Sequence, residues 1–488
     1  MRQHYIHYGS PQFRLLSDKQ ISEIQSASLN ILERTGVAFD TCPPALEILA
    51  DIGADITDSK RVKIPSYLVE EAIRTTPKTF TLYNREGEVA FTLNGQTGSH
   101  FGGSDGGPHY PDPRTGKRRA THVQDINDIA RLIDALPNIE WTMTASTHPT
   151  VPGEIADIVA LLHVLMYCSK PVGVSINTLD GLKEMIRVCS IISGSEKELK
   201  KKPFFIGSSE PVSPLSQDGE AMNCSLLCAE KGIPNIIYSM PMAGATAPAT
   251  FPAVLAMCNA EVLSQLVVLQ SRYPGTPVVL GSIPNAMDMK TCIFPYGAPE
   301  LSFLTAALTE IYHSYQIPMF GTAGCTDAGI IDAQVGIEIT YQILMTALSG
   351  ADLVHDIGVM NWGRLFSPTL HVLADEVIGM VKASMNGMEI NCDTLALDLI
   401  NKVGPRGNFI SEKHTREHFR RFWVPTLFDR SVNKENAKTC DNMLVEKTVK
   451  LLDTHKPKPL SNQVLSELNE IERSWFIKIG ADYPYPVL

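Results

Sequence analysis

Hydrophobic and polar positions follow one pattern in the first part of the chain and another from about residue 97 onward. In the first part, apolar residues recur at helical spacing, as at Ile21, Ile24 and Leu32, behind the capping box Ser17–Gln20. Strand-like runs there are short. The pattern predicts a mainly helical N-terminal extension over residues 1–96.

From residue 97, short apolar runs typical of buried strands alternate with helical stretches. Their starts are 31 to 42 residues apart, and a strand–helix unit needs about 30 residues, so parallel strands with helical crossovers are indicated. Continuous apolar character within a run is typical of strands that are covered on both faces. The eight predicted strands are 97–103, 139–146, 172–178, 204–210, 235–241, 277–283, 317–323 and 352–358.

Eight such units predict an α/β protein with a (β/α)8 barrel over residues 97–386. A charged, polar C-terminal part predicts a helical extension over 387–488 that packs on the barrel. A doubly wound dinucleotide-binding sheet would require GxGxxG after an early strand, and Gly102–Gly107 has the wrong spacing.

Composition narrows the class of protein. The chain has 488 residues, 44% hydrophobic and 19% charged, which is the balance of a protein with a large core. Its net charge of −11 argues against binding to nucleic acid or to an anionic membrane, because both need a basic face. The opening residues have no apolar signal region, and the most apolar stretches contain Glu261, Glu338 and Asp352. We therefore expect a cytoplasmic protein.

The ten cysteines contain no CxxC pair. Cys224 and Cys228 are four residues apart in a helical stretch, which is compatible with half of a metal site or with a buried helix face. The second interpretation is favoured because no further Cys/His pair follows at ligand spacing. We predict no protein-bound metal. Motifs typical of zinc peptidases, P-loop nucleotide binding and serine hydrolases are also absent.

The active site of such a barrel lies at the C-terminal ends of its strands. Each polar residue there has two interpretations. Asp327 could be an acid or a helix cap, and His355 could be a site residue or a satisfied core histidine. Trp362 could cover the core or offer an indole face to a cation. The residues considered from the predicted strand ends are Asp105, His148, Glu210, Asp327, His355, Trp362 and Arg364.

Several sequence motifs indicate a family resemblance when their order and spacing are taken together. They are Pro241–Pro248, Pro284–Lys290, Gly297–Glu300, Thr326–Gln334, Asp375–Met380 and Asp112–Arg119. With these pieces the chain resembles the trimethylamine methyltransferase superfamily of corrinoid-dependent proteins, over about residues 10 to 480. The defining member of that family carries pyrrolysine near the end of the seventh strand. This chain has only ordinary residues there, in Gly329–Asp332.

The chain thus resembles the branch without pyrrolysine, whose members demethylate quaternary amines such as glycine betaine, proline betaine and carnitine. For this chain the favoured expectation is glycine betaine. The resemblance implies methyl transfer to Co(I) of a corrinoid, cob(I)alamin in type, on a separate partner protein. The family's corrinoid proteins carry a DxHxxG motif that this chain lacks, so no cofactor is expected on it. A small-molecule amine, the corrinoid protein and a homo-oligomeric assembly are the expected partners.

In that mechanism Glu210, Asp327 and His355 are the predicted catalytic residues. The cation would lie against Trp362, with Phe366, Tyr110 and the carboxylate of Asp105 as further candidates. The carboxylate of a betaine would be held by His355, His148 or Arg364. Two other functions stay open: a barrel lyase or decarboxylase using His355 and Glu210 as acid and base, and a non-catalytic betaine-binding protein.

Overall fold

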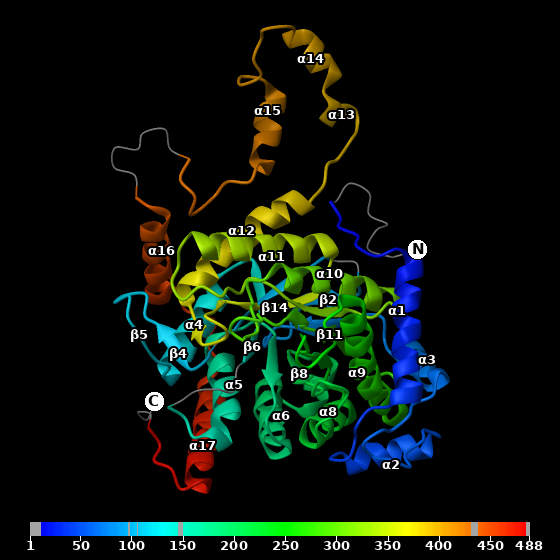
Figure 1. Cartoon of the computed structure of the whole chain (residues 1–488). Helices are drawn as coiled ribbons and strands as arrows, with labels where there is room; N and C mark the ends of the chain where they lie inside the picture. Colours follow the sequence, from blue (N-terminus) through cyan, green and yellow to red (C-terminus); the bar gives the residue numbers. More distant parts are fainter. Residues whose placement is uncertain (1–10, 96–97, 105, 145–149, 431–437, 485–488) are drawn as a thin grey trace.

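A closed barrel of eight parallel strands forms the centre of the molecule (Figure 1). The computed structural model describes residues 11–95, 98–104, 106–144, 150–430 and 438–484. The strands follow one another around the barrel in chain order, and the last pairs with the first. They are β3 (His100–Ser104), β6 (Ile139–Thr144), β7 (Val172–Ser175), β8 (Phe205–Ser209), β9 (Asn235–Ser239), β11 (Val278–Ser282), β13 (Met319–Thr322) and β14 (Leu353–Ile357).

The predicted (β/α)8 barrel is therefore confirmed, with all eight strands in the predicted places. The observed strands are shorter than the predicted runs. The third, for example, stops at Ser175 because Thr178 caps the next helix, its side chain accepting a hydrogen bond from the N–H of Gly181. A capping residue needs a backbone conformation that ends the strand ladder before it.

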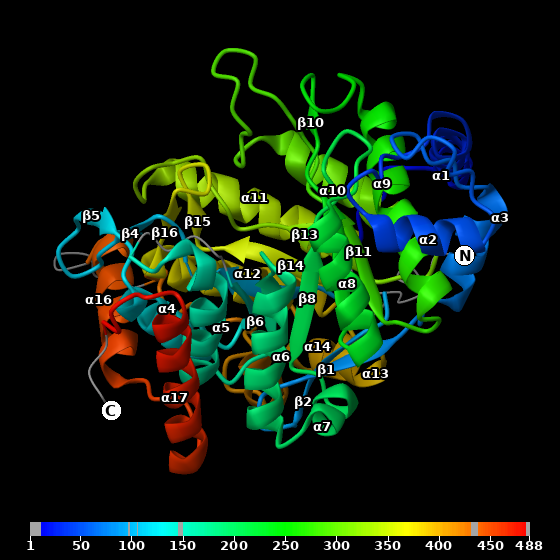
Figure 2. The same ribbon diagram turned by 90° about the horizontal axis from the view of Figure 1, so that it is seen from below.

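One helix follows each barrel strand and covers the barrel from outside (Figure 2). The helices are α4 (Val123–Ala135), α5 (Ala156–Tyr167), α6 (Leu179–Ser193), α8 (Gly219–Lys231), α9 (Phe251–Arg272), α10 (Pro299–Ser314), α11 (Ala333–Ser349) and α12 (Pro368–Met385). Short helices η3 (Gly153–Ile155) and α7 (Glu196–Lys201) interrupt the connections. By length and composition α9 could cross a membrane, but 89% of its apolar window is buried inside the protein, as in a core helix.

Large rings fill the barrel interior. The Trp141 side chain on β6 and the Phe320 side chain on β13 lie 6.4 Å apart although two strands separate β6 from β13, so they meet inside the barrel. A Cβ atom at Gly102 would lie 2.3 Å from the Trp141 ring, and one at Gly173 would lie 2.9 Å from it. Glycine at both positions therefore makes the space that the indole occupies.

The N-terminal part covers one side and the bottom of the barrel. It comprises α1 (Asp18–Asn30), η2 (Ile31–Thr35), α2 (Pro43–Asp51), α3 (Ser66–Thr75) and a hairpin of β1 (Phe80–Tyr83) and β2 (Val89–Leu93). The hairpin lies at the N-terminal ends of the strands, where Tyr83 donates its backbone N–H to Pro203 and the Phe91 ring stacks on His100 at 4.2 Å. The opposite end of the barrel stays open to ligands.

Two small sheets surround that opposite end. In Figure 2, β10 (Met242–Ala243), which pairs with β12 (Asn285–Ala286), stands above the barrel strands. A four-stranded sheet is built from β15 (Val359–Met360), β16 (Leu365–Phe366), β4 (His109–Pro111) and β5 (Arg118–Ala120).

The C-terminal part has two regions. After α12 the chain projects away from the barrel through α13 (Cys392–Leu395), α14 (Leu397–Val403), α15 (Lys413–His418) and η4 (Phe419–Arg421) (Figure 1). It returns where the carboxylate of Glu376 accepts backbone N–H bonds from Thr426 at 2.6 Å and Leu427 at 3.1 Å. Beyond it, α16 (Cys440–Thr454) packs on α12 and α4, and α17 (Asn462–Lys478) packs on α5 and α6.

Candidate active site at the barrel mouth

Glu210 and Tyr238 mark the open end of the barrel. Glu210 directly follows β8, and its carboxylate forms a hydrogen-bonding interaction with the hydroxyl of Tyr238 on the neighbouring strand β9. Beside them lies a cavity of about 590 Å³, also lined by Asn177, Ser209 and Thr246. Its wall thus combines a carboxylate, a phenol and small polar groups.

His355 forms the floor of this mouth. Its ring stacks on Phe320, with centroids 4.4 Å apart, and lies 6.2 Å from the ring of Tyr238 across the barrel interior. Its Nε2 is 2.8 Å from the Thr322 hydroxyl, and its Nδ1 is 3.1 Å from the carboxylate of Asp356. Only 6% of the residue is exposed. Both ring nitrogens have partners, so the imidazole is held in one orientation.

Asp356 has the backbone conformation that few side chains adopt, with φ of 76°. The pairing of β14 with β3 shifts register between Val354 and Ile357. The regular alternation of side chains is interrupted there, so His355 and Asp356 can both lie at the mouth. Burial raises the pKa of Tyr296, and the nearby charges of Asp356 and Glu210 raise it further. We call Glu210, Tyr238, Tyr296, His355 and Asp356 the mouth cluster.

The charge of the mouth cluster is set by its two carboxyl groups. Burial raises the pKa of Glu210, while the Tyr238 hydrogen bond and the charge of His355 lower it in part. Glu210 retains exposed surface, but the surrounding walls remove enough water to destabilise its charged form. An ionised carboxylate that is poorly hydrated attracts a cation strongly.

Asp327 connects two mouth loops. Its Oδ2 accepts the N–H of Gly297 at 2.9 Å, and its own N–H bonds Glu338 at 3.0 Å. Burial raises its pKa, and the charge of Glu338 adds to the rise. The helix-cap interpretation is wrong, because α11 begins after Asp332 and the Asp332 side chain caps it. The structure instead places Asp327 in a loop-to-loop contact next to the mouth cluster.

Trp362 lies at the turn between β15 and β16. Asn361, Trp362 and Gly363 all have positive φ, and 42% of Trp362 is exposed. The hairpin runs along the segment after β13, where the N–H of Thr326 donates to Val359 at 3.0 Å. Trp362 and the exposed Arg364 therefore stand on the rim of the mouth.

Tyr110 and Phe366 are buried in the four-stranded outer sheet. The Arg119 guanidinium lies 4.8 Å above the Tyr110 ring and occupies one of its faces. The Phe366 ring packs where a Cβ of Gly107 would lie 2.1 Å away. Neither ring belongs to the mouth cluster. Asp105 and His148, the remaining predicted site residues, lie outside the described residues.

Of the predicted site, Glu210 and His355 come together in space. Sequence reasoning missed Tyr238 and Tyr296. Tyr238 interrupts the apolar run 235–240, and an aromatic hydroxyl near the end of a buried strand is the signal that could have identified it. Tyr296 lies in a long loop after β12, and no local pattern in the sequence places it.

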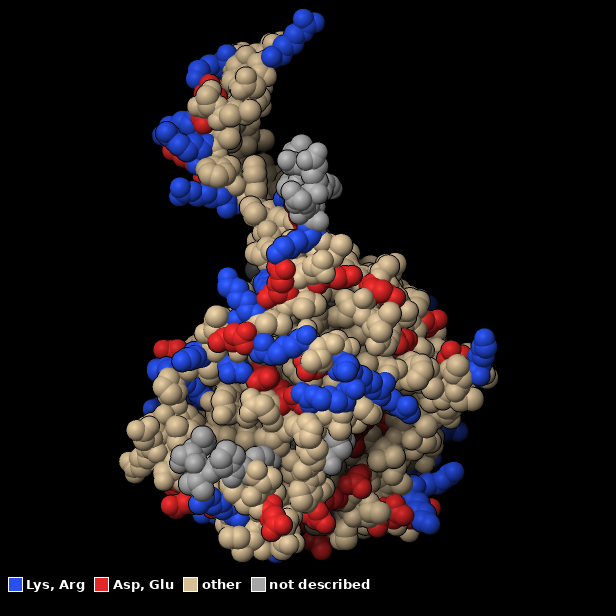
Figure 3. All heavy atoms as spheres, turned by 90° about the vertical axis from the view of Figure 1, so that its left-hand side faces the viewer, with Lys and Arg blue, Asp and Glu red and all other residues tan. Residues whose placement is uncertain are grey.

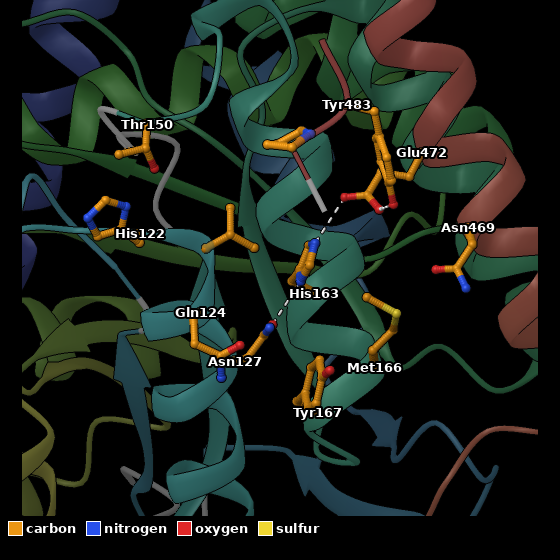
Figure 4. A pocket seen from close by; sticks show the side chains of 12 residues that line it. His122, Gln124, Asn127, Thr150, His163, Met166, Tyr167, Asn469, Glu472 and Tyr483 are labelled. Atoms are coloured by element: carbon orange, nitrogen blue, oxygen red, sulfur yellow. Dashed lines mark hydrogen bonds and ion pairs between the residues drawn. The ribbon is translucent and has the colours of Figure 1, made fainter. Parts of the chain in front are cut away.

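A second cavity, of about 370 Å³, lies between α4, α5 and α17 on the outside of the barrel (Figure 4). His163 spans it: Nδ1 is 2.8 Å from the Asn127 amide oxygen and Nε2 is 2.9 Å from the Glu472 carboxylate. Tyr483 donates its hydroxyl to the same carboxylate at 2.7 Å. This network joins the C-terminal helix to the barrel wall, so we assign it to stability rather than chemistry.

Within the described ranges, no group of three or more His, Cys, Asp or Glu side chains could hold a metal ion. The ten cysteines are all free, and seven of them are buried. Cys224 and Cys228 lie on the buried face of α8, as the favoured interpretation predicted.

The chain is similar to known proteins over most of its length. The chain is 32% identical over 464 residues to trimethylamine methyltransferase MttB of Desulfitobacterium hafniense, covering 93% of this chain and 92% of the relative. It is 30% identical over 431 residues to glycine betaine methyltransferase of the same species, covering 88% of this chain and 89% of the relative. The fold was also compared with the crystal structure of the Methanosarcina barkeri monomethylamine methyltransferase. The TM-score is 0.48 at 11% identity, and the match covers 97% of this chain and 90% of that chain.

The family model described as trimethylamine methyltransferase (MTTB) matches residues 1–474, which is nearly the whole chain. This match and the full-length relatives leave no long segment unaccounted for. The chain therefore belongs to the trimethylamine methyltransferase (MTTB) family.

Proposed function

We propose that this methyltransferase moves a methyl group from a quaternary amine, with glycine betaine favoured, to Co(I) of a corrinoid carried by a partner protein. The N–CH3 bond breaks, its electron pair stays on nitrogen, and a Co–CH3 bond forms from the cobalt electron pair. Dimethylglycine leaves as the product, and the cobalt becomes methyl-Co(III). The two relatives named above differ in substrate at nearly equal identity, so the choice of amine depends on the site.

The observation that carries the proposal is the mouth cluster. Glu210 offers negative charge, and the aromatic side chains of Tyr238 and Tyr296 lie near it. A quaternary ammonium has a permanent charge and no N–H, so aromatic faces and a nearby carboxylate are the groups that hold it. A protonated tertiary amine has an N–H that Glu210 can accept, so discrimination against it has to come from the ring contacts rather than from the charge.

A quaternary amine also suits a site without a special electrophile. Its nitrogen leaves as a neutral amine, so the methyl carbon is already activated for attack by cobalt. The segment that resembles the pyrrolysine region of the family has only Gly329–Asp332, on the exposed rim. This supports a quaternary rather than a tertiary substrate.

The protein's own residues then orient the substrate and exclude water. In this proposal Glu210 and the rings of Tyr238 and Tyr296 hold the cation, and His355, fixed by Thr322 and Asp356, closes the floor. Arg364, exposed on the rim, would hold the carboxylate of a betaine, and His148, which lies outside the described residues, stays the other candidate from the sequence. One methyl group would face the solvent side, where a corrinoid too large for the barrel can reach it.

The test is methylation of free cob(I)alamin under a reducing atmosphere, read by visible absorbance. Glycine betaine should be used, with proline betaine and carnitine as competing substrates, while dimethylglycine and trimethylamine should not. Use of trimethylamine alone would contradict the proposal. Turnover without any corrinoid would favour the lyase hypothesis, and tight betaine binding without methyl-cobalt would favour a binding protein.

The corrinoid partner and the cytoplasmic location belong to the same proposal. The purified protein should be colourless, because the chain lacks the DxHxxG motif of the family's corrinoid proteins. A stoichiometric corrinoid that copurifies with this chain alone would contradict the two-protein arrangement.

A further inference from the structure

The cavity beside Glu210 extends past the mouth cluster. It measures about 590 Å³ and reaches from Glu210 and Tyr238 to the first turn of α8, at Asp218 and Ala221. A volume in this range is typical of sites for ligands larger than glycine betaine. A trimethylammonium group held at Glu210 therefore leaves space in the cavity for the rest of a longer ligand.

Uncharged polar side chains also line this cavity. We call Asn177, Ser208 and Thr246 the neutral wall. The Ser208 hydroxyl donates to the backbone oxygen of Val174 at 2.6 Å, so its lone pairs remain to accept from a ligand. The Thr246 hydroxyl accepts the backbone N–H of Met242 at 2.9 Å, so its proton remains to be donated. The neutral wall thus offers both an acceptor and a donor, and the Asn177 amide adds both kinds.

A hydroxyl group is the chemical match for the neutral wall. It can accept the proton of Thr246 and donate its own proton to Ser208 at the same time. A carboxylate can only accept, so its oxygens would face the lone pairs of Ser208 without a proton between them. The hydrogen-bonding pattern of the wall therefore favours an alcohol over an acid.

The charges on the cavity wall favour an uncharged group as well. Glu210 and Asp218 contribute two carboxyl groups, and none of the lining residues that the structure describes is Lys, Arg or His. Lys and Arg are common elsewhere on the molecule, because Figure 3 shows them interleaved with Asp and Glu over an outer face. A carboxylate inside the cavity would be repelled by two like charges, whereas a hydroxyl group would not.

Arg364 offers a positive charge at the mouth, but it stands on the rim and is not among the described lining residues. A betaine whose ammonium group lies at Glu210 would turn its carboxylate outward, to Arg364. A quaternary amine with an uncharged tail can turn that tail inward, to the neutral wall. One position for the cation thus serves two directions for the rest of the substrate.

We propose that the mouth accepts a second class of substrate, quaternary ammonium compounds whose other end is a neutral hydroxyl group, which Thr246 and Ser208 bind. This substrate class rests on the proposed methyl transfer and extends it. One N–CH3 bond of the substrate breaks, its electron pair stays on nitrogen, and the electron pair of Co(I) forms the Co–CH3 bond. The products are a neutral dimethylated amino alcohol and methyl-Co(III) on the corrinoid.

Choline is the probe, because it joins the trimethylammonium group of glycine betaine to a hydroxyl group. Calorimetric titration measures its binding, and methylation of free cob(I)alamin measures kcat/KM. We expect choline to bind and to reach a kcat/KM within about tenfold of that for glycine betaine. Neohexyl alcohol, the uncharged carbon analogue of choline, should bind at least about tenfold more weakly, since it lacks the charge that Glu210 attracts.

Four variants separate the two directions. Thr246→Val removes the hydroxyl and should lower the choline-to-betaine ratio of kcat/KM at least about fivefold, whereas Thr246→Ser should restore the ratio. Arg364→Ala should raise the ratio at least about fivefold, because it removes the cation that holds a carboxylate. Thr291→Val, on the exposed loop after β12, is the control and should keep the wild-type ratio. The thermal transition of each variant verifies folding.

The two proposals fail in different ways. If no quaternary amine methylates cob(I)alamin, the proposed methyl transfer is wrong, and the same ratios measured as affinities then decide whether the neutral wall binds a hydroxyl group. The second substrate class is overturned if choline does not bind. It is also overturned if Thr246→Val and Arg364→Ala both keep the wild-type ratio.

Discussion

The ring of His355 lies flat against Phe320, with centroids 4.4 Å apart and an angle of 22° between their planes. The imidazole therefore has an aromatic surface against one of its faces. This contact explains why a histidine in an apolar strand can belong to the site: packing holds the ring, and Thr322 and Asp356 satisfy its nitrogens. The core interpretation and the site interpretation of His355 are thus compatible.

Glu210→Gln should weaken binding of a quaternary amine without disturbing the fold. The substitution keeps the shape and removes the charge, and at this partly exposed position the charge is worth about 1–2 kcal/mol, or roughly 5- to 30-fold in affinity. Calorimetric titration with glycine betaine measures the effect. Glu154→Gln, an exposed carboxylate on another loop after a barrel strand, is the matched control and should bind as the wild type. Equal affinity for both variants would remove Glu210 from the cation site.

The pKa of Glu210 also predicts a dependence on pH. Burial raises this pKa above its ordinary value, so the charged form is lost at a higher pH than usual. Betaine affinity should therefore fall as the pH is lowered through the raised pKa, while affinity of Glu210→Gln stays level. Stability should change in the opposite sense: above that pKa the native state bears the cost of the partly desolvated charge, so Glu210→Gln should be more stable than wild type there. Chemical denaturation of both proteins at one pH below and one pH above that pKa measures the effect. An equal difference in unfolding free energy at both pH values would contradict this reasoning.

Trp362→Ala should raise the Michaelis constant for glycine betaine only modestly. Because the indole stands on the rim and is 42% exposed, a cation contact there is worth about 0.5–1 kcal/mol, or roughly two- to fivefold. The backbone cost of the positive φ is nearly the same for Trp and Ala, so the side chain alone is tested. Trp362→Phe should raise the Michaelis constant less than Trp362→Ala does. Unchanged rates and constants for Trp362→Ala would mean that the indole is a packing residue.

Asp327→Asn removes the charge of this side chain and keeps a hydrogen-bond acceptor. The amide oxygen can still accept the N–H of Gly297, and the repulsion from Glu338 is removed. We expect methyl transfer within about twofold of wild type, because the loop contact persists, whereas Asp327→Ala should lose about 1 kcal/mol of stability. Initial rates and urea denaturation of both variants provide the measurements. A loss of transfer above tenfold in Asp327→Asn at unchanged stability would restore Asp327 as a charged catalytic group.

Glu472→Ala should destabilise the protein by about 3 kcal/mol, because it leaves the buried His163 and the half-buried Tyr483 hydroxyl without their carboxylate. Urea denaturation measures this, and Glu467→Ala, exposed on the same helix, serves as control. The rate per folded molecule should not change, since the network lies outside the barrel mouth. A reduced rate at full stability would mean that this second cavity takes part in the function.

The barrel could be predicted from the sequence because each strand is a short apolar run at regular spacing. Glu210 and His355 could be predicted for the same reason, since they end or interrupt such runs. Tyr296 could not, because a long loop after β12 brings it to the mouth through tertiary packing. Tyr110 has a suitable side chain and position in the chain, but the β4–β5 hairpin carries it into the outer sheet under Arg119. Chain position predicts the mouth only when no insertion intervenes.

The column of rings that begins at Trp141 sets how deep a ligand can go. The Trp141 ring lies beside that of Phe320, Phe320 stacks on His355, and Gly102 and Gly173 leave room for the Trp141 ring. These packed rings fill the barrel interior, so the mouth is closed from below and is not a tunnel. Under the proposed methyl transfer, an ammonium group bound above these rings stays within reach of the acceptor, and the two glycines that make room for Trp141 help to set its depth.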